Sequence, residues 1–184
     1  DELGRLITPK TKAVFVCNPN NPTGAVLSVE AMNAICAAAE RSGAWVGADE
    51  VYRGAELDGH PTASFWGRYP KVIVAGGLSK AYGLPGLRIG WILAPPEMTD
   101  TLWSYHDYTT IAPGALSDRL ARLALDPARR ARILERTRSI LRRNFPLVKE
   151  WLDARRDQFT YAPPEAGAIV YVKYTHPINS TELV

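Results

Sequence analysis

The sequence predicts an α/β protein in which a mostly parallel sheet forms a three-layer α/β/α unit, followed by the start of a smaller α+β domain. Short, continuous apolar runs occur at 13–17, 44–50, 71–77 and 88–94, and a helix or a long loop separates them. Strands covered by helices on both faces have this pattern. After Pro95 the sequence becomes helical, and two further strands around a proline-rich turn are expected within 158–174.

The first half of the chain contains the predicted sheet. AVFVC at 13–17 is rich in β-branched and aromatic residues and ends in the turn-forming NPNNPTG at 18–24. Ser28 is placed to cap a helix that ends near Ser42, with Gly43 just beyond it. AWVGADE, KVIVAGG and RIGWILA supply the other three strands.

The second half is predicted to be mainly helical. Helices are expected at about 97–108, 114–125 and 127–156, the last interrupted or kinked at Pro146. We therefore expect residues 1–125 to belong to a large domain. Residues 126–184 would form a long connecting helix and the beginning of a small C-terminal domain.

Composition excludes several classes of protein. A 46% hydrophobic share with 22% charged residues is ordinary for a globular chain. No apolar run approaches the roughly 18–20 residues that cross a bilayer, and no basic and apolar leader opens the sequence, so we expect a cytoplasmic protein without a membrane partner. Cys17 and Cys36 have no metal or redox spacing and are expected to be buried free thiols. The histidines are scattered, so no metal site is expected.

Arginine is concentrated in the last predicted helix. Residues 126–157 hold nine arginines and Lys149 against five acidic residues. Apolar residues recur there at helical spacing, which places the arginines mostly on the opposite, solvated face. No aromatic platform or nucleic-acid motif accompanies them, so no nucleic-acid partner is expected.

Polar residues follow the predicted strands at their carboxyl ends, where open parallel sheets bind ligands. Asn21 follows the first strand, Asp49 and Tyr52 end the second, and Lys80 follows the third. Arg88 opens the fourth strand and reaches the same edge only if that strand is antiparallel.

These side chains match one kind of ligand. The amine of Lys80 lies among glycines, so a flat molecule can approach it, and it can act as a nucleophile toward a carbonyl. Asp49 follows apolar residues and needs a positive partner. The phenol of Tyr52 can bond a ring oxygen, and the forked guanidinium of Arg88 suits a phosphate. An aldehyde, a basic ring nitrogen, a ring hydroxyl and a phosphate together describe pyridoxal 5'-phosphate, with Lys80 forming the Schiff base.

The motifs NPNNPTG, DEVY and SKAYGLPGLRIG, in this order and spacing, resemble the fold type I pyridoxal-phosphate-dependent enzymes of the aspartate aminotransferase superfamily, aminotransferase class I/II. The resemblance covers essentially the whole chain. It implies that Asn21 and Tyr52 bond the ring oxygen, Asp49 the ring nitrogen, Lys80 the aldehyde carbon and Arg88 the phosphate. It also implies a homodimer whose active sites are shared between subunits.

Two departures from the family pattern are visible. The family places a hydroxyl residue three positions before the lysine, where this chain has Gly77, and Ser79 is the candidate substitute for that phosphate contact. The family's preceding region and its far carboxyl-terminal arginine have no counterpart among these 184 residues. We therefore expect the segment to be part of a protein about twice as long, and to bind the cofactor poorly alone.

Transamination is the expected reaction, with Lys80 moving a proton and an amino group passing between an amino acid and a 2-oxo acid. Catalysis would rest on Lys80, Asp49 and Tyr52. Two alternatives stay open: a β-elimination, replacement or amino-acid cyclisation enzyme of the same fold, and a non-catalytic regulatory module built on it. The sequence does not define the amino-acid substrate.

Overall fold

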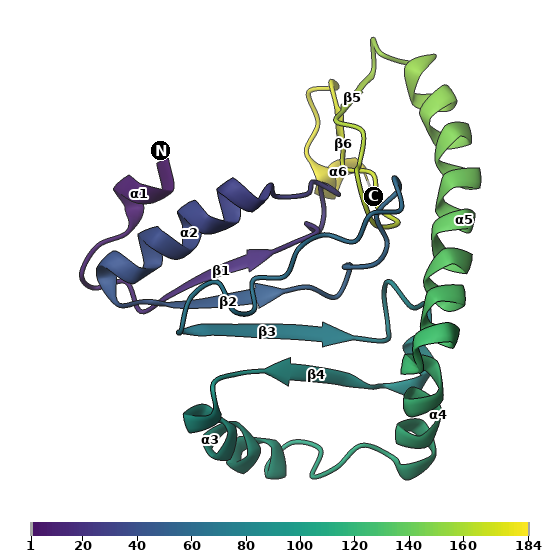
Figure 1. Ribbon diagram of the computed structural model, residues 1–184. Coiled ribbons are helices and arrows are strands. Elements are labelled where there is room, and N and C mark those ends of the chain that lie inside the picture. The colour runs from purple at the N-terminus through teal and green to yellow at the C-terminus, as the bar shows by residue number, and fades with distance from the viewer. Residues whose placement is uncertain (1, 184) are drawn as a thin grey trace.

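The computed structural model describes residues 2–183, and its architecture is of the α/β class (Figure 1). The first part of the chain contains α1 (Glu2–Leu6), β1 (Ala13–Cys17), α2 (Val29–Ser42), β2 (Trp45–Asp49), β3 (Val72–Gly77), the 3-10 turn η1 (Pro85–Leu87) and β4 (Gly90–Leu93). The second part contains α3 (Pro96–Asp107), α4 (Ala115–Leu125), α5 (Pro127–Asp153), β5 (Phe159–Tyr161), β6 (Val172–Tyr174) and α6 (Ser180–Leu183).

The four strands of the first part form one sheet in the order β1-β2-β3-β4. β1, β2 and β3 are parallel, with Cys17 beside Asp49 and Asp49 beside Ala75 in the register. β4 runs antiparallel to β3, with Gly77 beside Gly90. The mostly parallel sheet is confirmed. Because β4 is antiparallel, the condition under which the Arg88 segment returns to the carboxyl edge of the sheet is met.

Helix α2 covers one face of the sheet and makes the main core with it. Met32, Cys36 and Ala39 recur at helical spacing and are buried against the strands. The Ser28 hydroxyl accepts a hydrogen bond from the Ala31 N–H at 3.2 Å, and Gly43 ends the helix with φ 68°, as both residues predicted. The core contains Val14, Met32, Cys36, Ala39, Ala44, Val46, Ala48, Phe65, Val72 and Val74.

The opposite face of the sheet is open within residues 2–183. Phe15 on β1 is 84% exposed and Ile92 on β4 is 57% exposed. Together with Gly47, Ile73 and Ala75 these side chains line a mostly apolar hollow of about 480 Å³. β1, β2 and β3 therefore have one face that contributes to the core with α2 and one face that lines this hollow.

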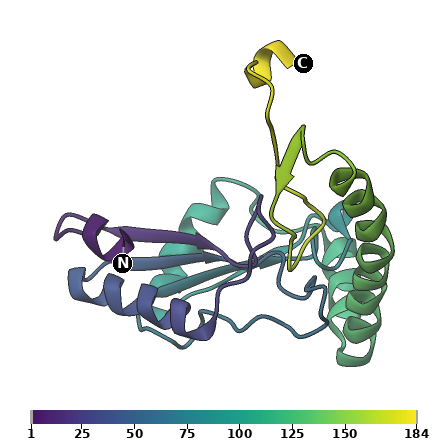
Figure 2. The ribbon, with the colours of Figure 1, turned by 90° about the horizontal axis from the view of Figure 1, so that it is seen from above.

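The second part of the chain crosses the carboxyl edge of the sheet. Figure 2 shows the strands as one layer, α2 along one side of it and α5 across the end toward which β1, β2 and β3 point. β5 and β6 pair antiparallel beyond α5, as the sequence predicted.

The structure corrects two local expectations. α5 continues through Pro146 without interruption. Arg88 does not open a strand, because Pro85–Leu87 form a 3-10 turn that Arg88 ends with φ 53°, and β4 begins only at Gly90. The fixed φ of Pro85 favours such a turn immediately before the strand.

No helix among the described residues combines the length and the apolar character that crossing a membrane requires.

Replacing Ser28 with Ala removes the cap of α2 and is expected to lower the free energy of unfolding by about 1 kcal/mol. Ser28→Asp keeps an acceptor for the Ala31 N–H and is expected to stay near the parent value. The midpoints of urea unfolding measure both effects. Equal midpoints for Ser28→Ala and Ser28→Asp would show that the cap contributes no stability.

Candidate active site

Three loops that follow parallel strands meet at the carboxyl edge of the sheet (Figure 1). The loop after β1 carries Asn21, β2 ends at Asp49 with Tyr52 in the turn beyond it, and the loop after β3 carries Lys80. The edge is held together by backbone bonds, since Asn18 N–H donates to the Asp49 carbonyl at 2.9 Å and Ala81 N–H donates to the Val51 carbonyl at 3.3 Å. Parallel pairing thus brings the predicted residues to one side of the molecule.

Asp49 lies at the edge of the open face of the sheet. Its side chain accepts a hydrogen bond from the Val51 N–H at 3.0 Å and lines the apolar hollow together with Cys17 and Asn20. Partial burial raises the pKa of the Cys17 thiol, and the Asp49 charge adds to the rise, while a bond from the Asn21 N–H opposes it. Cys17 is only half-buried and lies near the carboxylate, so the expectation of a buried free thiol is confirmed for Cys36 and wrong for Cys17.

Tyr52 and Lys80 come from different loops and lie close together in the structure. The Lys80 ammonium lies 6.0 Å from the centroid of the Tyr52 ring, at the limit for a cation–π contact. The Tyr52 ring is buried, and the Lys80 side chain is exposed. Because its side chain is exposed, the Lys80 amine is accessible to a ligand.

Arg88 and Ser79 lie on segments that run side by side. The Leu78 N–H donates to the Ile89 carbonyl at 3.0 Å, which joins the two segments. Arg88 has a left-handed backbone and an exposed side chain, and its guanidinium donates to the Pro85 carbonyl at 3.2 Å. Non-glycine residues adopt this conformation rarely, and such residues cluster at functional sites.

The predicted residues retain unused hydrogen-bonding capacity. Within residues 2–183, no hydrogen bond is made by the side-chain polar atoms of Asn21, Tyr52, Ser79 or Lys80. The predicted residues offer an amine, a phenol, an amide and a carboxylate, and the carboxylate of Asp49 lines an apolar hollow of about 480 Å³. Small-molecule sites combine apolar lining with a few polar groups. These residues fit pyridoxal 5'-phosphate. The hollow itself includes Asp49 but not Tyr52, Lys80 or Arg88.

Segment 164–167 joins the loops of Asn21 and Tyr52. The Gly24 carbonyl accepts hydrogen bonds from the N–H groups of Glu165 and Ala166 at 2.9 and 3.0 Å. A Cβ atom on Gly24 would stand 2.4 Å from the Pro164 Cβ, so only glycine permits this approach. A Cβ atom on Gly167 would stand 3.3 Å from the Tyr52 ring. One short segment therefore packs on two of the three site loops.

The loop that follows Tyr52 is fixed by a buried carboxylate. Glu56 is 2% exposed, and its side chain accepts hydrogen bonds from the Gly54 N–H at 2.9 and 3.0 Å and from the Thr62 N–H at 2.8 Å. Backbone N–H groups compensate the cost of burying this carboxylate.

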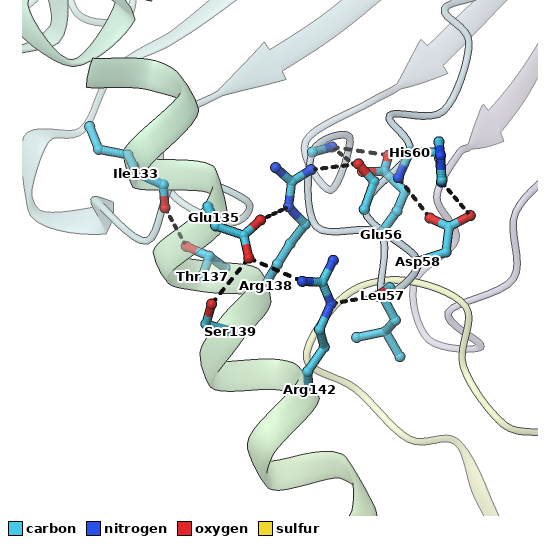
Figure 3. Close-up of polar contacts among 12 residues, drawn as sticks. Glu56, Leu57, Asp58, His60, Ile133, Glu135, Thr137, Arg138, Ser139 and Arg142 are labelled. Atoms are coloured by element: carbon cyan, nitrogen blue, oxygen red, sulfur yellow. Dashed lines mark hydrogen bonds and ion pairs between the residues drawn. The ribbon is translucent and has the colours of Figure 1, made fainter. Parts of the chain in front are cut away.

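Arginines of α5 bind the same loop from outside (Figure 3). Arg142 Nε donates to the Leu57 carbonyl at 2.6 Å, and Arg138 donates to the Gly59 carbonyl at 3.2 Å. Glu135 forms ion pairs with both guanidinium groups, at 3.0 Å to Arg142 and 3.2 Å to Arg138. The expectation that the arginines of this helix mainly face solvent is therefore wrong for these two.

The spacing of these arginines relative to a buried leucine could have predicted the contacts, although the apolar periodicity of the helix alone did not distinguish them from the solvated arginines. Arg130, Arg138 and Arg142 share one row of the helix, at multiples of four residues, with Leu134, which is 4% exposed. Arginines in line with a buried leucine lie beside the packed face, because their long stems cover apolar surface while the charged ends reach outward. No comparable pattern marked Glu56.

Comparison with known proteins identifies the class. The family described as aminotransferase class I and II matches residues 1–183, so the chain belongs to that family. The family and its pyridoxal-phosphate-dependent members imply pyridoxal 5'-phosphate as the cofactor.

Individual relatives support the assignment. Capreomycidine synthase of Streptomyces vinaceus is 30% identical over 183 residues, which are 100% of this chain and 46% of that protein. Aromatic-amino-acid aminotransferase 2 of Thermococcus litoralis is 32% identical over 80% of this chain and 39% of that protein. The chain thus spans about half the length of the curated relatives it matches, or less.

Solved structures share the fold. A PLP-dependent aminotransferase from Streptococcus suis superposes with a TM-score of 0.89 at 36% identity, over 99% of this chain and 47% of that one. Aspartate aminotransferase from Thermus thermophilus gives a TM-score of 0.85 at 28% identity, over 92% of this chain and 44% of that one.

Replacing Glu56 with Gln is expected to lower the free energy of unfolding by about 1–3 kcal/mol, because an amide nitrogen would face backbone donors in a buried site. Asp58→Asn changes an exposed carboxylate in the same loop and is expected to stay within about 0.5 kcal/mol of the parent. Urea unfolding followed by circular dichroism measures both variants. An unchanged midpoint for Glu56→Gln would contradict the role assigned to its carboxylate.

Proposed function

We propose that the protein containing this chain is a pyridoxal-phosphate-dependent aminotransferase that moves an amino group between an amino acid and a 2-oxo acid. The observation that carries the proposal is the meeting of three motif loops at one sheet edge, with the Lys80 amine 6.0 Å from the Tyr52 ring centroid. Family membership over residues 1–183 supports it.

Each site residue has a proposed role in holding the cofactor. The amine of Lys80 would hold the cofactor covalently through its aldehyde carbon. Asp49 keeps the ring nitrogen protonated through its negative charge. Asn21 and Tyr52 donate hydrogen bonds to the ring oxygen. Arg88 binds the phosphate, with Ser79 as a second phosphate contact.

The same residues have proposed roles in the reaction. When bound, pyridoxal 5'-phosphate supplies an electron sink that makes the bonds at the amino acid's Cα labile. The amine of Lys80, freed when an amino acid binds, would take the proton from the Cα of that amino acid as a general base and return it to the C4' carbon of the cofactor as a general acid. Asp49 supports the electron sink by preserving its positive charge. Lys80, Asp49 and Tyr52 are therefore the proposed catalytic group.

The assembly and the domain division are also proposals. Family membership supports a homodimer with shared active sites, amino-acid and 2-oxo-acid substrates, and the expected division into a large domain to residue 125 and a connecting helix with the start of a small domain beyond it. Along the sequence, α5 (Pro127–Asp153) comes after the strands of the sheet and before the β5–β6 pair, and this order supports that boundary.

A second candidate is an amino-acid cyclisation, elimination or replacement enzyme of the same fold. It is favoured by the relative that matches 100% of this chain, which is named capreomycidine synthase and not aminotransferase. Both candidates begin with removal of the Cα proton by Lys80, so the residues of this chain serve either outcome.

Replacing Lys80 with Ala in the protein encoded by the complete reading frame is expected to abolish the borohydride-fixed bond to the cofactor and to lower kcat by about 10²–10⁴-fold or more. Far-ultraviolet circular dichroism is expected to stay unchanged, because the side chain is exposed. Lys173→Ala, at another exposed lysine, serves as the matched control. A cofactor bond that persists in Lys80→Ala would assign the nucleophile to another residue.

Mixing the cofactor-loaded protein with single amino acids, without a 2-oxo acid, is expected to convert the absorption of the bound cofactor to that of its amine form. Product analysis by mass spectrometry separates the two candidates. A 2-oxo acid identifies amino transfer, and a cyclised, eliminated or substituted amino acid identifies the second candidate. Inertness toward a broad amino-acid panel would contradict both.

A further inference from the structure

Helix α5 contacts the lysine loop as well as the tyrosine loop. Arg130 Nε donates a hydrogen bond to the Tyr82 hydroxyl at 2.9 Å, and Arg136 donates to the Tyr82 carbonyl at 2.9 Å. Tyr82 lies two residues after Lys80 and 48 residues before Arg130 in the sequence. Two guanidinium groups thus bind the two ends of a single residue next to the proposed nucleophile.

Tyr82 is a buried anchor of its loop. Its side chain is 5% exposed and packs edge-on against Trp91, with ring centroids 6.3 Å apart and planes at 86°. The surrounding apolar cluster comes from the loop of Tyr52, the loop of Lys80, α4 and α5, and contains Ala55, Leu78, Ala81, Ala121 and Leu134. A buried phenol costs free energy unless it is hydrogen-bonded, and a charged donor makes the stronger bond.

The turn that carries Lys80 is closed directly beneath this anchor. The Gly83 N–H donates to the Lys80 carbonyl at 2.9 Å, so Ala81 and Tyr82 form the centre of a turn that begins at Lys80. Gly83 has φ 62°, and a Cβ atom there would stand 3.0 Å from Arg136 Nη2. The left-handed backbone favours glycine at this position, and the Arg136 side chain of α5 reaches the turn there.

The exposed Lys80 side chain depends on this backbone for its direction. Within residues 2–183 the Lys80 amine has no hydrogen-bond partner, and its described contact is the Tyr52 ring. Lysine has about 2 kcal/mol of rotamer entropy, so only a fixed backbone keeps the amine near its reaction partner. A misplacement of about 1 Å can cost about 10²-fold in rate.

We propose that Arg130 and Arg136 are positioning residues for Lys80, acting through Tyr82. The inference rests on the proposed function of Lys80 as the amine that bonds the cofactor. The reactivity of the Lys80 amine would then depend on α5, although α5 contributes none of the proposed cofactor-binding residues.

The test uses the protein from the complete reading frame, freed of cofactor, with Arg130→Gln, Arg130→Lys and Tyr82→Phe. Arg132→Gln is the matched control, since Arg132 is exposed and makes no hydrogen bond or ion pair within residues 2–183. Amide hydrogen exchange of peptides over 78–84 reports the turn. Borohydride trapping after addition of pyridoxal 5'-phosphate, read on the Lys80 peptide by mass spectrometry, gives the rate of bond formation.

Arg130→Gln and Tyr82→Phe are each expected to slow bond formation at Lys80 about tenfold and to speed exchange in the turn by a similar factor, the size of a lost charge-assisted hydrogen bond. Arg130→Lys is expected to recover most of the rate, because an ammonium still donates to the phenol. A variant that combines Arg130→Gln with Tyr82→Phe is expected to be no slower than the slower of the two single variants, because both remove the same hydrogen bond. Arg132→Gln is expected to match the parent.

Parent-like trapping and exchange in Arg130→Gln and Tyr82→Phe would overturn the inference, even if their melting temperatures fall. Failure of the parent protein to bond the cofactor at Lys80 would instead overturn the proposed function. In that case hydrogen exchange on the cofactor-free protein still decides whether the arginines hold the turn.

Discussion

The parallel pairing of β1, β2 and β3 is the constraint on which the rest of the structure depends. Because the three strands point the same way, the loops that follow them must meet, although their motifs are separated by tens of residues. The antiparallel β4 then brings the turn of Arg88 to the same edge. The direction of the strands thus determines where the site lies. The apolar runs that form the strands also show which polar residues stand at the strand ends.

A second level of organisation comes from α5. This helix contributes none of the proposed cofactor-binding residues, but it binds the turn of Lys80 through Arg130 and Arg136 and the loop beyond Tyr52 through Arg138 and Arg142. Most of these bonds end on backbone carbonyls, so they constrain the course of the chain and leave the ligand-binding side chains free. The arginine-rich composition of this stretch therefore has a structural cause.

The mostly parallel sheet and helix α2 with both its caps could be predicted from the sequence, because they follow from local patterns: apolar runs, a capping serine and a glycine after the last turn. The direction of β4 could not, because an apolar run does not show which way its strand points. The left-handed Arg88 could not, since Pro85 and Gly86 indicate a turn without showing that it extends to Arg88. Glu56 was also missed, because its partners are backbone N–H groups that only the folded loop brings together. The roles of Asn21, Asp49, Tyr52, Ser79, Lys80 and Arg88 stay predictions, although the structure brings their segments to one edge.

Segment 164–167 has a consequence for how the site responds to movement. It bonds the carbonyl of Gly24, three residues after Asn21, and it packs Gly167 on the ring of Tyr52. Asn21 and Tyr52 are the two residues assigned to the same oxygen of the cofactor ring. A shift of the C-terminal strands would therefore loosen or tighten both donors at once, so that this oxygen experiences a paired change in hydrogen bonding and not two independent ones.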